Sequence, residues 1–142
     1  MASLSIEVIM TVGINKPLTK YSKEQLREKL LSIGGTVALI PSIEEDLPQI
    51  LERGVSPSIK HLYVMKGRDS QCHENSALCW DANRGYSSIM TGYALSKGQW
   101  VQHSWVLDSR KTIVETTFKR EAYFGFELTP EEADQFYFDN VW

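Results

Sequence analysis

The sequence predicts an α+β fold in which helices pack against an antiparallel β-sheet. Three observations lead to this prediction. The first half of the chain alternates strand-like and helix-like stretches, and a helix-like stretch that begins near residue 71 follows it. Residues 86–128 then hold four stretches rich in β-branched and aromatic residues, separated by short turn-like segments. A chain of 142 residues without repeats or long linkers fits one self-sufficient domain, spanning residues 1–142.

The first half is expected to contain three strands and two helices. In chain order these are a strand at Leu4–Val12, a helix at Lys23–Ile33, a strand at Thr36–Ile40, a helix at Leu47–Arg53 and a strand at His61–Met65. Ser22 is a suitable N-cap for the first helix because Gln25 follows three residues later. Pro48 is tolerated in a first helical turn, so the second helix should begin after Asp46.

A third helix should begin close to Gln71-Cys72, carry Ala77, Leu78 and Trp80 inward, and end at Asn83-Arg84-Gly85. Four strands should follow as an antiparallel meander, at Tyr86–Leu95, Gln99–Leu107, Thr112–Phe118 and Tyr123–Leu128. A closing helix is expected with Thr129 as its N-cap and Pro130 at its first position.

Composition narrows the class of partner. The net charge of −3 comes from 15 basic and 18 acidic residues that are well mixed, so we expect no nucleic-acid partner. The N-terminal stretch lacks a basic leader and Glu7 interrupts its apolar run, which predicts neither a signal peptide nor a membrane span and favours a cytoplasmic protein. Cys72 and Cys79 on one helix would lie about 10.5 Å apart, too far for a disulfide. Two free thiols suit a reducing compartment.

Cys72, His103 and Glu115 form the candidate catalytic set. A cysteine at a helix N-terminus lies near the positive end of the helix dipole, which favours the thiolate. The thiol also needs a base, and the base needs an orienting acceptor. A loop of three or five residues would place His103 directly opposite Glu115 in neighbouring strands, at hydrogen-bonding reach. Asp108 competes as the acceptor but lies roughly 16 Å along the same strand, so Glu115 is preferred.

The remaining cysteine and histidines have simpler interpretations. Cys79 should be a small buried side chain of the core. His73 lies about 100° around the helix from Cys72, so it is a poor base for that thiol, and His61 has no partner in the sequence. These residues show no zinc-binding spacing, and no nucleotide-binding or zinc-protease motif occurs, so we expect neither a metal nor a cofactor.

The stretch from Gln71 to Thr117 resembles the transglutaminase-like branch of the papain-like cysteine enzymes. The matching features are Cys72 at a helix start, Gly92-Tyr93 on a strand, His103-Ser104-Trp105, and Glu115-Thr116. The resemblance implies a Cys–His–acid triad on a papain-like core and amide or ester chemistry through a thioacyl intermediate. This chain departs from the family in carrying Glu115 where Asp is usual and His73 directly after the cysteine.

These features predict a thiol-dependent hydrolase, a peptidase (thiol protease), amidase or deamidase, that acts on a peptide or other amide-containing substrate. The backbone N–H of Cys72 and the Gln71 side chain are candidate oxyanion donors, and Trp105 is either a wall of the site or part of the core. Two alternatives stay open. One is a catalytically inactive binding or regulatory module on the same scaffold, and the other is an acyltransferase with the same triad.

Overall fold

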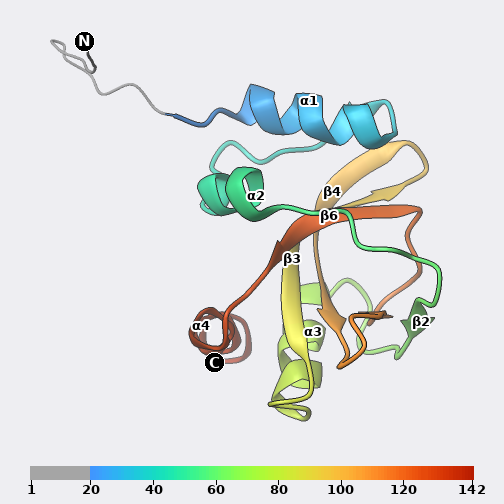
Figure 1. The fold of residues 1–142 in the computed structure, drawn as a ribbon, viewed down its shortest axis with the longest axis vertical. Helices are drawn as coiled ribbons and strands as arrows, with labels where there is room; N and C mark the ends of the chain where they lie inside the picture. Colours follow the sequence, from blue (N-terminus) through green and yellow to red (C-terminus); the bar gives the residue numbers. More distant parts are fainter. Residues whose placement is uncertain (1–19) are drawn as a thin grey trace, which may run out of the picture.

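The computed structural model describes residues 20–142, which form four helices and a six-stranded sheet with the strand order β2-β5-β4-β3-β6, while β1 pairs with β4 (Figure 1). The helices are α1 (Lys23–Ile33), α2 (Leu47–Arg53), α3 (Cys72–Asp81) and α4 (Pro130–Val141). The strands are β1 (Val37–Ala38), β2 (Tyr63–Val64), β3 (Ser88–Ser96), β4 (Gln99–Leu107), β5 (Ile113–Glu115) and β6 (Ala122–Glu127). The predicted α+β class is confirmed, and the expected strand at Leu4–Val12 lies outside the described residues.

The predicted starts of α1 and α4 are confirmed by reciprocal side-chain caps. The Ser22 hydroxyl accepts a hydrogen bond from the Gln25 backbone N–H at 3.2 Å, and the Gln25 side chain accepts one from the Ser22 N–H at 2.7 Å. Thr129 and Glu132 form the same reciprocal pair before α4, with Pro130 at its first position. These caps satisfy backbone N–H groups that a helix start leaves unpaired, so each one fixes its helix boundary.

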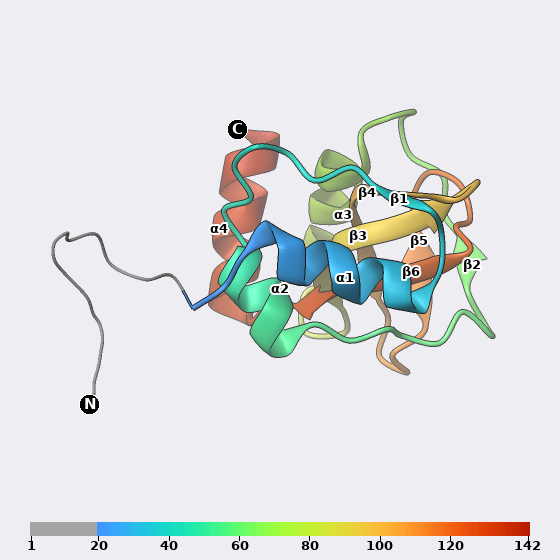
Figure 2. The ribbon, with the colours of Figure 1, turned by 90° about the horizontal axis from the view of Figure 1, so that it is seen from above.

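The sheet has two differently covered faces. One face carries Ile89, Tyr93 and Phe126 and packs against apolar side chains from all four helices, including Leu30 and Trp80. In Figure 2, α1 lies over β3 and β6 on this side, and α2 lies next to α1 and against β6. The opposite face carries a second apolar cluster, made of Met90, Ala94, Trp105, Leu107, Ile113 and Tyr123, and Ile59 and Leu62 of the chain between α2 and α3 pack against it.

The strands do not form the simple meander that the sequence predicts. Strands β3, β4 and β5 follow one another as antiparallel neighbours, but β6 pairs with β3 instead of β5. Strand β2 pairs in parallel with β5, so the outer edge of β5 is already occupied. The chain after β5 therefore crosses to the free edge of β3.

Three further local expectations are corrected, the first being the strand at Thr112–Phe118, which is confined to Ile113–Glu115 as β5. The strands β1 and β2 are two residues each, shorter than predicted, and β1 pairs in parallel with β4 at Gln99 and Trp100. Leu78 points outward and is 43% exposed, because the buried face of α3 carries Asn75, Ser76, Ala77 and Trp80. Within residues 20–142, no helix combines the length and the apolar character that crossing a bilayer requires.

Candidate active site

Cys72 is the first residue of α3 and is half-buried at the edge of a cavity of about 420 Å³. His103 of β4 lines the same cavity, together with Thr117, Phe118 and Arg120 from the chain after β5. The first N–H groups of an α-helix have no partner within the helix, so the start of α3 presents backbone donors and the positive end of its dipole near the thiol. The fold thus brings Cys72 and His103 to one hollow.

His103 and Glu115 form a buried hydrogen-bonded pair beside the cavity. Their Nε2 and Oε1 atoms are 2.8 Å apart, and the side chains are 1% and 0% exposed. Because Glu115 occupies Nε2, Nδ1 is the nitrogen left for the Cys72 thiol. The predicted contact between His103 and Glu115 is therefore present.

The strand register differs from the predicted one. Val106 pairs with Val114 and Leu107 pairs with Ile113 across a loop of five residues, so continuing the ladder places Glu115 opposite Trp105. His103 and Glu115 are diagonal neighbours on the same face, where Cβ atoms are about 7 Å apart. The long side chain of Glu115 reaches across this separation. Asp108 is held in the loop instead, where its Oδ1 accepts hydrogen bonds from the N–H groups of Arg110 and Thr112.

The pKa directions favour an ion pair of thiolate and imidazolium. Burial acts to raise the pKa of the Cys72 thiol, but hydrogen bonding and charge from His103, with the Ser104 backbone N–H, lower it overall. Burial acts to lower the pKa of His103, but hydrogen bonds to Cys72 and Glu115 raise it above its usual value. Each partner therefore stabilises the charged form of the other.

Glu115 is held as a carboxylate by four hydrogen bonds. Oε1 accepts from the Tyr123 hydroxyl at 2.7 Å in addition to His103, and Oε2 accepts from the Thr117 N–H at 3.0 Å and the Thr117 hydroxyl at 2.9 Å. Burial acts to raise the pKa of Glu115, but His103, Tyr123 and Thr117 lower it to about 2. The carboxylate stays charged although no water reaches it.

A second layer of contacts fixes the residues around Glu115. Arg120 is buried, donates from Nη2 to the Thr117 hydroxyl at 2.9 Å and from Nε to the Phe118 carbonyl at 3.0 Å, and its backbone N–H donates to the Tyr123 hydroxyl at 3.2 Å. Thr117, Arg120 and Tyr123 were not predicted from the sequence. Thr117 could have been found because it lies two residues after Glu115, whereas Tyr123 depends on the crossing of β6.

Asn75 ties the start of α3 to the chain after β5. Its side chain bonds both backbone groups of Arg68, accepting from N–H at 3.1 Å and donating to C=O at 2.8 Å, and it also donates to the Thr116 carbonyl at 3.4 Å. Gly67 lies directly against Asn75, since a Cβ atom there would be 2.5 Å from Asn75 Cγ. This clasp, made of Gly67, Arg68, Asn75 and Thr116, sets the position of the first turn of α3.

Two predicted neighbours of the site lie elsewhere. Gln71 is the exposed N-cap of α3, its side chain makes no capping bond, and it does not line the cavity. Trp105 is fully buried and lies outside the cavity, with its ring stacked on His103 at a centroid distance of 6.0 Å and packed edge-on against Tyr123 at 4.8 Å. It contributes to the core that supports His103.

Cys79 lies in a contrasting environment on the same helix. It is half-buried, where the sequence predicts full burial, and burial raises the pKa of its thiol. Both cysteines are free thiols. The part of the chain that the structure describes contains no group of three or more His, Cys, Asp or Glu side chains suited to holding a metal ion.

No family model, curated protein or solved structure matches this chain.

Proposed function

We propose that the protein is a cysteine hydrolase that cleaves an amide or peptide bond through Cys72, His103 and Glu115. The observation that carries the proposal is the buried 2.8 Å contact between His103 and Glu115 beside the cavity that Cys72 lines. A buried carboxylate that holds an imidazole next to a cysteine at a helix N-terminus has the arrangement by which thiol enzymes activate their nucleophile. The resemblance of these residues to the transglutaminase-like branch of the papain-like enzymes supports the same chemistry.

In the acylation step, the Cys72 thiolate attacks the substrate carbonyl carbon and forms an S–C bond. The carbonyl π electrons move to the oxygen, for which the backbone N–H of Cys72 is a donor. His103 then gives the proton on Nδ1 to the amide nitrogen, the C–N bond breaks and the amine leaves. Glu115 keeps Nε2 engaged throughout, so the ring does not rotate away from the sulfur.

Deacylation uses the same groups with water as the nucleophile. His103 takes a proton from water at Nδ1, the resulting hydroxide attacks the thioester carbon, and the S–C bond breaks to release the carboxylic acid and regenerate Cys72. Tyr123 and Thr117 act through Glu115 and are positioning residues. Water as acceptor needs no second substrate site, which favours hydrolysis over acyl transfer in a domain of this size.

The test is to map which thiol captures an electrophilic mimic of an amide. A short peptide nitrile, whose carbon accepts a thiolate to give a thioimidate, should label Cys72 and leave Cys79 unlabelled, as read by mass spectrometry of the digested protein. Glu115→Gln should slow this labelling by at least about tenfold, since the imidazolium loses its charged partner.

A matched variant at the other cysteine serves as the control. Cys79→Ala should label at the wild-type rate, because Cys79 does not line the cavity. Equal and slow capture by the two thiols would instead support a binding module without catalysis, and unchanged capture at Cys72 in Glu115→Gln would exclude Glu115 from the activation of the thiol.

A further inference from the structure

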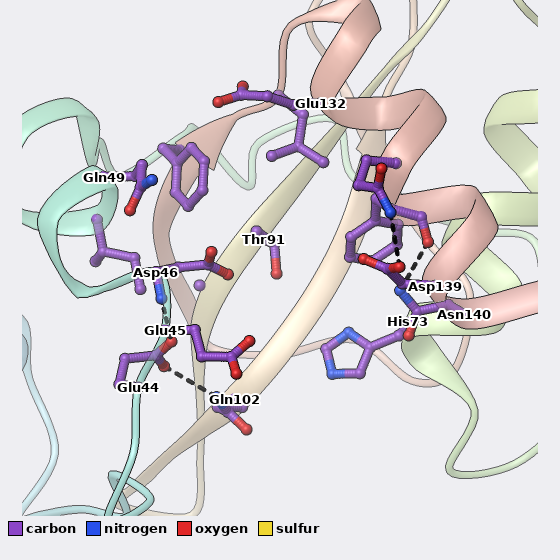
Figure 3. A pocket seen from close by; sticks show the side chains of 16 residues that line it. Glu44, Glu45, Asp46, Gln49, His73, Thr91, Gln102, Glu132, Asp139 and Asn140 are labelled. Atoms are coloured by element: carbon purple, nitrogen blue, oxygen red, sulfur yellow. Dashed lines mark hydrogen bonds between the residues drawn. The ribbon is translucent and has the colours of Figure 1, made fainter.

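A second cavity, of about 470 Å³, adjoins the candidate active site on the helix-covered side of the sheet (Figure 3). Gln102 of β4 lines both cavities, and the first two residues of α3 divide them, since Cys72 lines one and His73 the other. Both cavities therefore reach the first turn of α3 and the middle of β4.

Five carboxylates give the second cavity a strongly negative lining, and no lysine or arginine of the described residues is among the lining side chains. The carboxylates belong to Glu44, Glu45, Asp46, Glu132 and Asp139. Glu44 is held by the Tyr93 hydroxyl at 2.5 Å and by Gln102 Nε2 at 2.9 Å, and Glu132 pairs with Arg53.

Asp139 accepts a hydrogen bond from the neutral Gln135 amide at 2.8 Å, which leaves Glu45 and Asp46 as the two carboxylates without a partner among the described residues. Neither carboxylate receives a hydrogen bond or an ion pair from residues 20–142, and both line the cavity. Burial, followed by the charges of Glu44 and Glu45, raises the pKa of Asp46, as expected where negative charge lacks a counterion. A cation in the cavity would relieve this repulsion.

Four apolar side chains also line the cavity. Ile50 is 1% exposed, Phe126 is 2% exposed, and Leu128 and Phe136 complete the surface. A lining of carboxylates and apolar side chains suits a group that carries its positive charge on a hydrocarbon stem. The stem packs against the apolar side chains while the cationic group contacts the carboxylates.

Buried polar groups also present unpaired hydrogen-bonding capacity to this cavity, independently of the charges. Thr91 is 7% exposed and its hydroxyl lies 2.8 Å from the Ser104 hydroxyl, which in turn lies 2.6 Å from His73 Nδ1. Ser104 is fully buried between them. Thr91 and His73 both line the cavity, and Figure 3 shows their side chains directed into it.

The hydrogen-bonded series Thr91–Ser104–His73 leaves one donor and one acceptor unpaired, whichever way its hydrogen bonds run. If neutral His73 donates from Nδ1, the Thr91 hydroxyl hydrogen and the His73 Nε2 lone pair are unpaired. If Nδ1 accepts, the Nε2 hydrogen and a Thr91 oxygen lone pair are unpaired. With either direction of these hydrogen bonds, Thr91 and His73 together offer one donor and one acceptor to a ligand in the cavity. The Oε1 atom of Gln49 adds a further acceptor, since it is buried and without a partner among the described residues.

We propose that this cavity binds a positively charged group on an apolar stem, an alkylammonium or alkylguanidinium such as a lysine or arginine side chain, as the non-reacting part of the substrate of Cys72. The inference rests on the proposed function for the identity of the substrate, and it adds the charge class that the site selects. The ammonium or guanidinium head meets Glu45 and Asp46, and the stem lies on Ile50 and Phe126.

The first experiment measures binding without chemistry. Hexylamine, hexanol and hexanoate share a hexyl chain and differ in the charge of the terminal group. Each is added stepwise to the Cys72→Ala protein, and binding is followed by NMR chemical shifts. Hexylamine should bind at least about tenfold more tightly than hexanol, and should shift the resonances of Thr91 and His73. Hexanoate should not bind.

Variants test whether the carboxylates of the cavity are responsible. Asp46→Asn and Glu45→Gln should each weaken hexylamine binding by about tenfold, whereas Glu28→Gln, which removes an exposed carboxylate from α1, should not change it. Asn remains a suitable cap for α2, so Asp46→Asn keeps the helix start. Equal binding of hexanol and hexylamine, or an affinity that both variants leave unchanged, would overturn the inference.

The second experiment tests whether the two cavities serve one ligand. In chloroacetamides the thiolate forms an S–C bond and chloride leaves, so the rate at Cys72 reports how well the stem is held. An ω-aminoalkyl chloroacetamide should label Cys72 at least about fivefold faster than its alkyl counterpart at an optimal stem length, and Asp46→Asn should remove the difference. Equal rates at every stem length would contradict a shared ligand.

The outcomes separate this inference from the proposed function. Hexylamine binding together with an unreactive Cys72 would retain the cation site and reject the hydrolase. A reactive Cys72 without charge preference in either experiment would retain the hydrolase and reject the cation site.

Discussion

The two cysteines of α3 are the same residue on the same helix, seven positions apart, yet their surroundings push the thiols in opposite directions. Burial raises the pKa of Cys79. Burial also acts on Cys72, but His103 and the Ser104 N–H outweigh it and lower the pKa of that thiol. The difference arises from partners on β4, a strand distant in sequence, and from the position of Cys72 at the helix start.

The reactivity of Cys72 thus has one contribution from helix α3 and another from the sheet. The start of α3 gives Cys72 a favourable dipole, an effect of about 1 kcal/mol near a helix terminus. The sheet contributes His103, which lowers the pKa of the Cys72 thiol and whose charge is maintained by a carboxylate with a pKa of about 2. Reactivity at Cys72 should therefore depend on residues that Cys79 does not contact, and the following predictions test that dependence.

The largest effect is expected from Glu115→Gln on stability. A buried carboxylate whose pKa falls to about 2 contributes stability above its ordinary pKa, and this contribution is lost as the pH falls toward about 2. The variant should lose about 3 kcal/mol of unfolding free energy above about pH 5, and this loss should shrink in more acidic solution. Denaturant unfolding across pH measures it, with Glu28→Gln as the surface control. A deficit that does not change with pH would contradict this role of Glu115.

Asn75→Ala should weaken the Cys72 end of the helix selectively. The change leaves the backbone groups of Arg68 without their partners, which costs about 2 kcal/mol. Alkylation of Cys72 should slow as the first turn loses its clasp, while alkylation of Cys79 should not slow. Asn83→Ala is the matched control at the other end, where the exposed Asn83 side chain donates to the Cys79 carbonyl, and it should cost less than about 0.5 kcal/mol. Equal effects of the two variants would contradict the difference between the helix ends.

Alkylation with iodoacetamide at about pH 6 should discriminate the thiols directly. Cys72 should react at least about tenfold faster than Cys79, since a larger share of it is thiolate. His103→Ala should abolish this preference. Peptide mapping by mass spectrometry gives both rates in one sample, and an unchanged ratio in the variant would show that His103 does not activate Cys72.

Tyr123→Phe should give the smallest effect. It removes the hydrogen bond to Glu115 Oε1 and the acceptor of the Arg120 backbone N–H, and it leaves the contact with His103 in place, so a loss of between about 1 and 2 kcal/mol is expected. The pKa of Glu115 should rise, as measured by NMR of the side-chain carboxyl carbon, and Cys72 alkylation should slow less than in His103→Ala. A pKa of Glu115 that stays constant would remove Tyr123 from the positioning residues.

Local signals in the sequence predicted the elements well. The bounds Lys23–Ile33, Leu47–Arg53 and Gln99–Leu107 agree with the structure, because caps, Pro48 and a nearby Gly or Ser mark them within a few residues. The placement of Cys72 at a helix start rested on the same kind of local pattern.

Features that depend on pairing between distant strands were not predictable in the same way. The register that makes Glu115 a diagonal neighbour of His103 arises because the five-residue loop, held by Asp108, covers residues 108–112, whereas the predicted register requires a five-residue loop at 107–111 or a three-residue loop at 108–110. The resulting shift of the pairing by two residues preserves every face. For that reason the triad contact was predicted although its register was wrong. Tyr123 reaches Glu115 only because β6 crosses to β3, which no local pattern encodes. Leu78 was misassigned because α3 buries polar Asn75 and Ser76.

The acidic cavity was likewise absent from the sequence prediction. Its carboxylates come from the chain before α2 and from α4, more than 80 residues apart in sequence, and only the packing of these helices on one sheet face brings them together. Well-mixed charges along the chain therefore did not exclude a concentrated negative surface in the fold.

The most direct measurement is the pKa of the Cys72 thiol, obtained by titrating the ultraviolet absorbance of the thiolate in Cys79→Ala protein, where Cys72 is the only cysteine. The pKa should lie below the ordinary cysteine value of about 8.5 and should rise when His103→Ala is added. A thiol that titrates above that value, with or without His103, would contradict the activation of Cys72 by the His103–Glu115 pair.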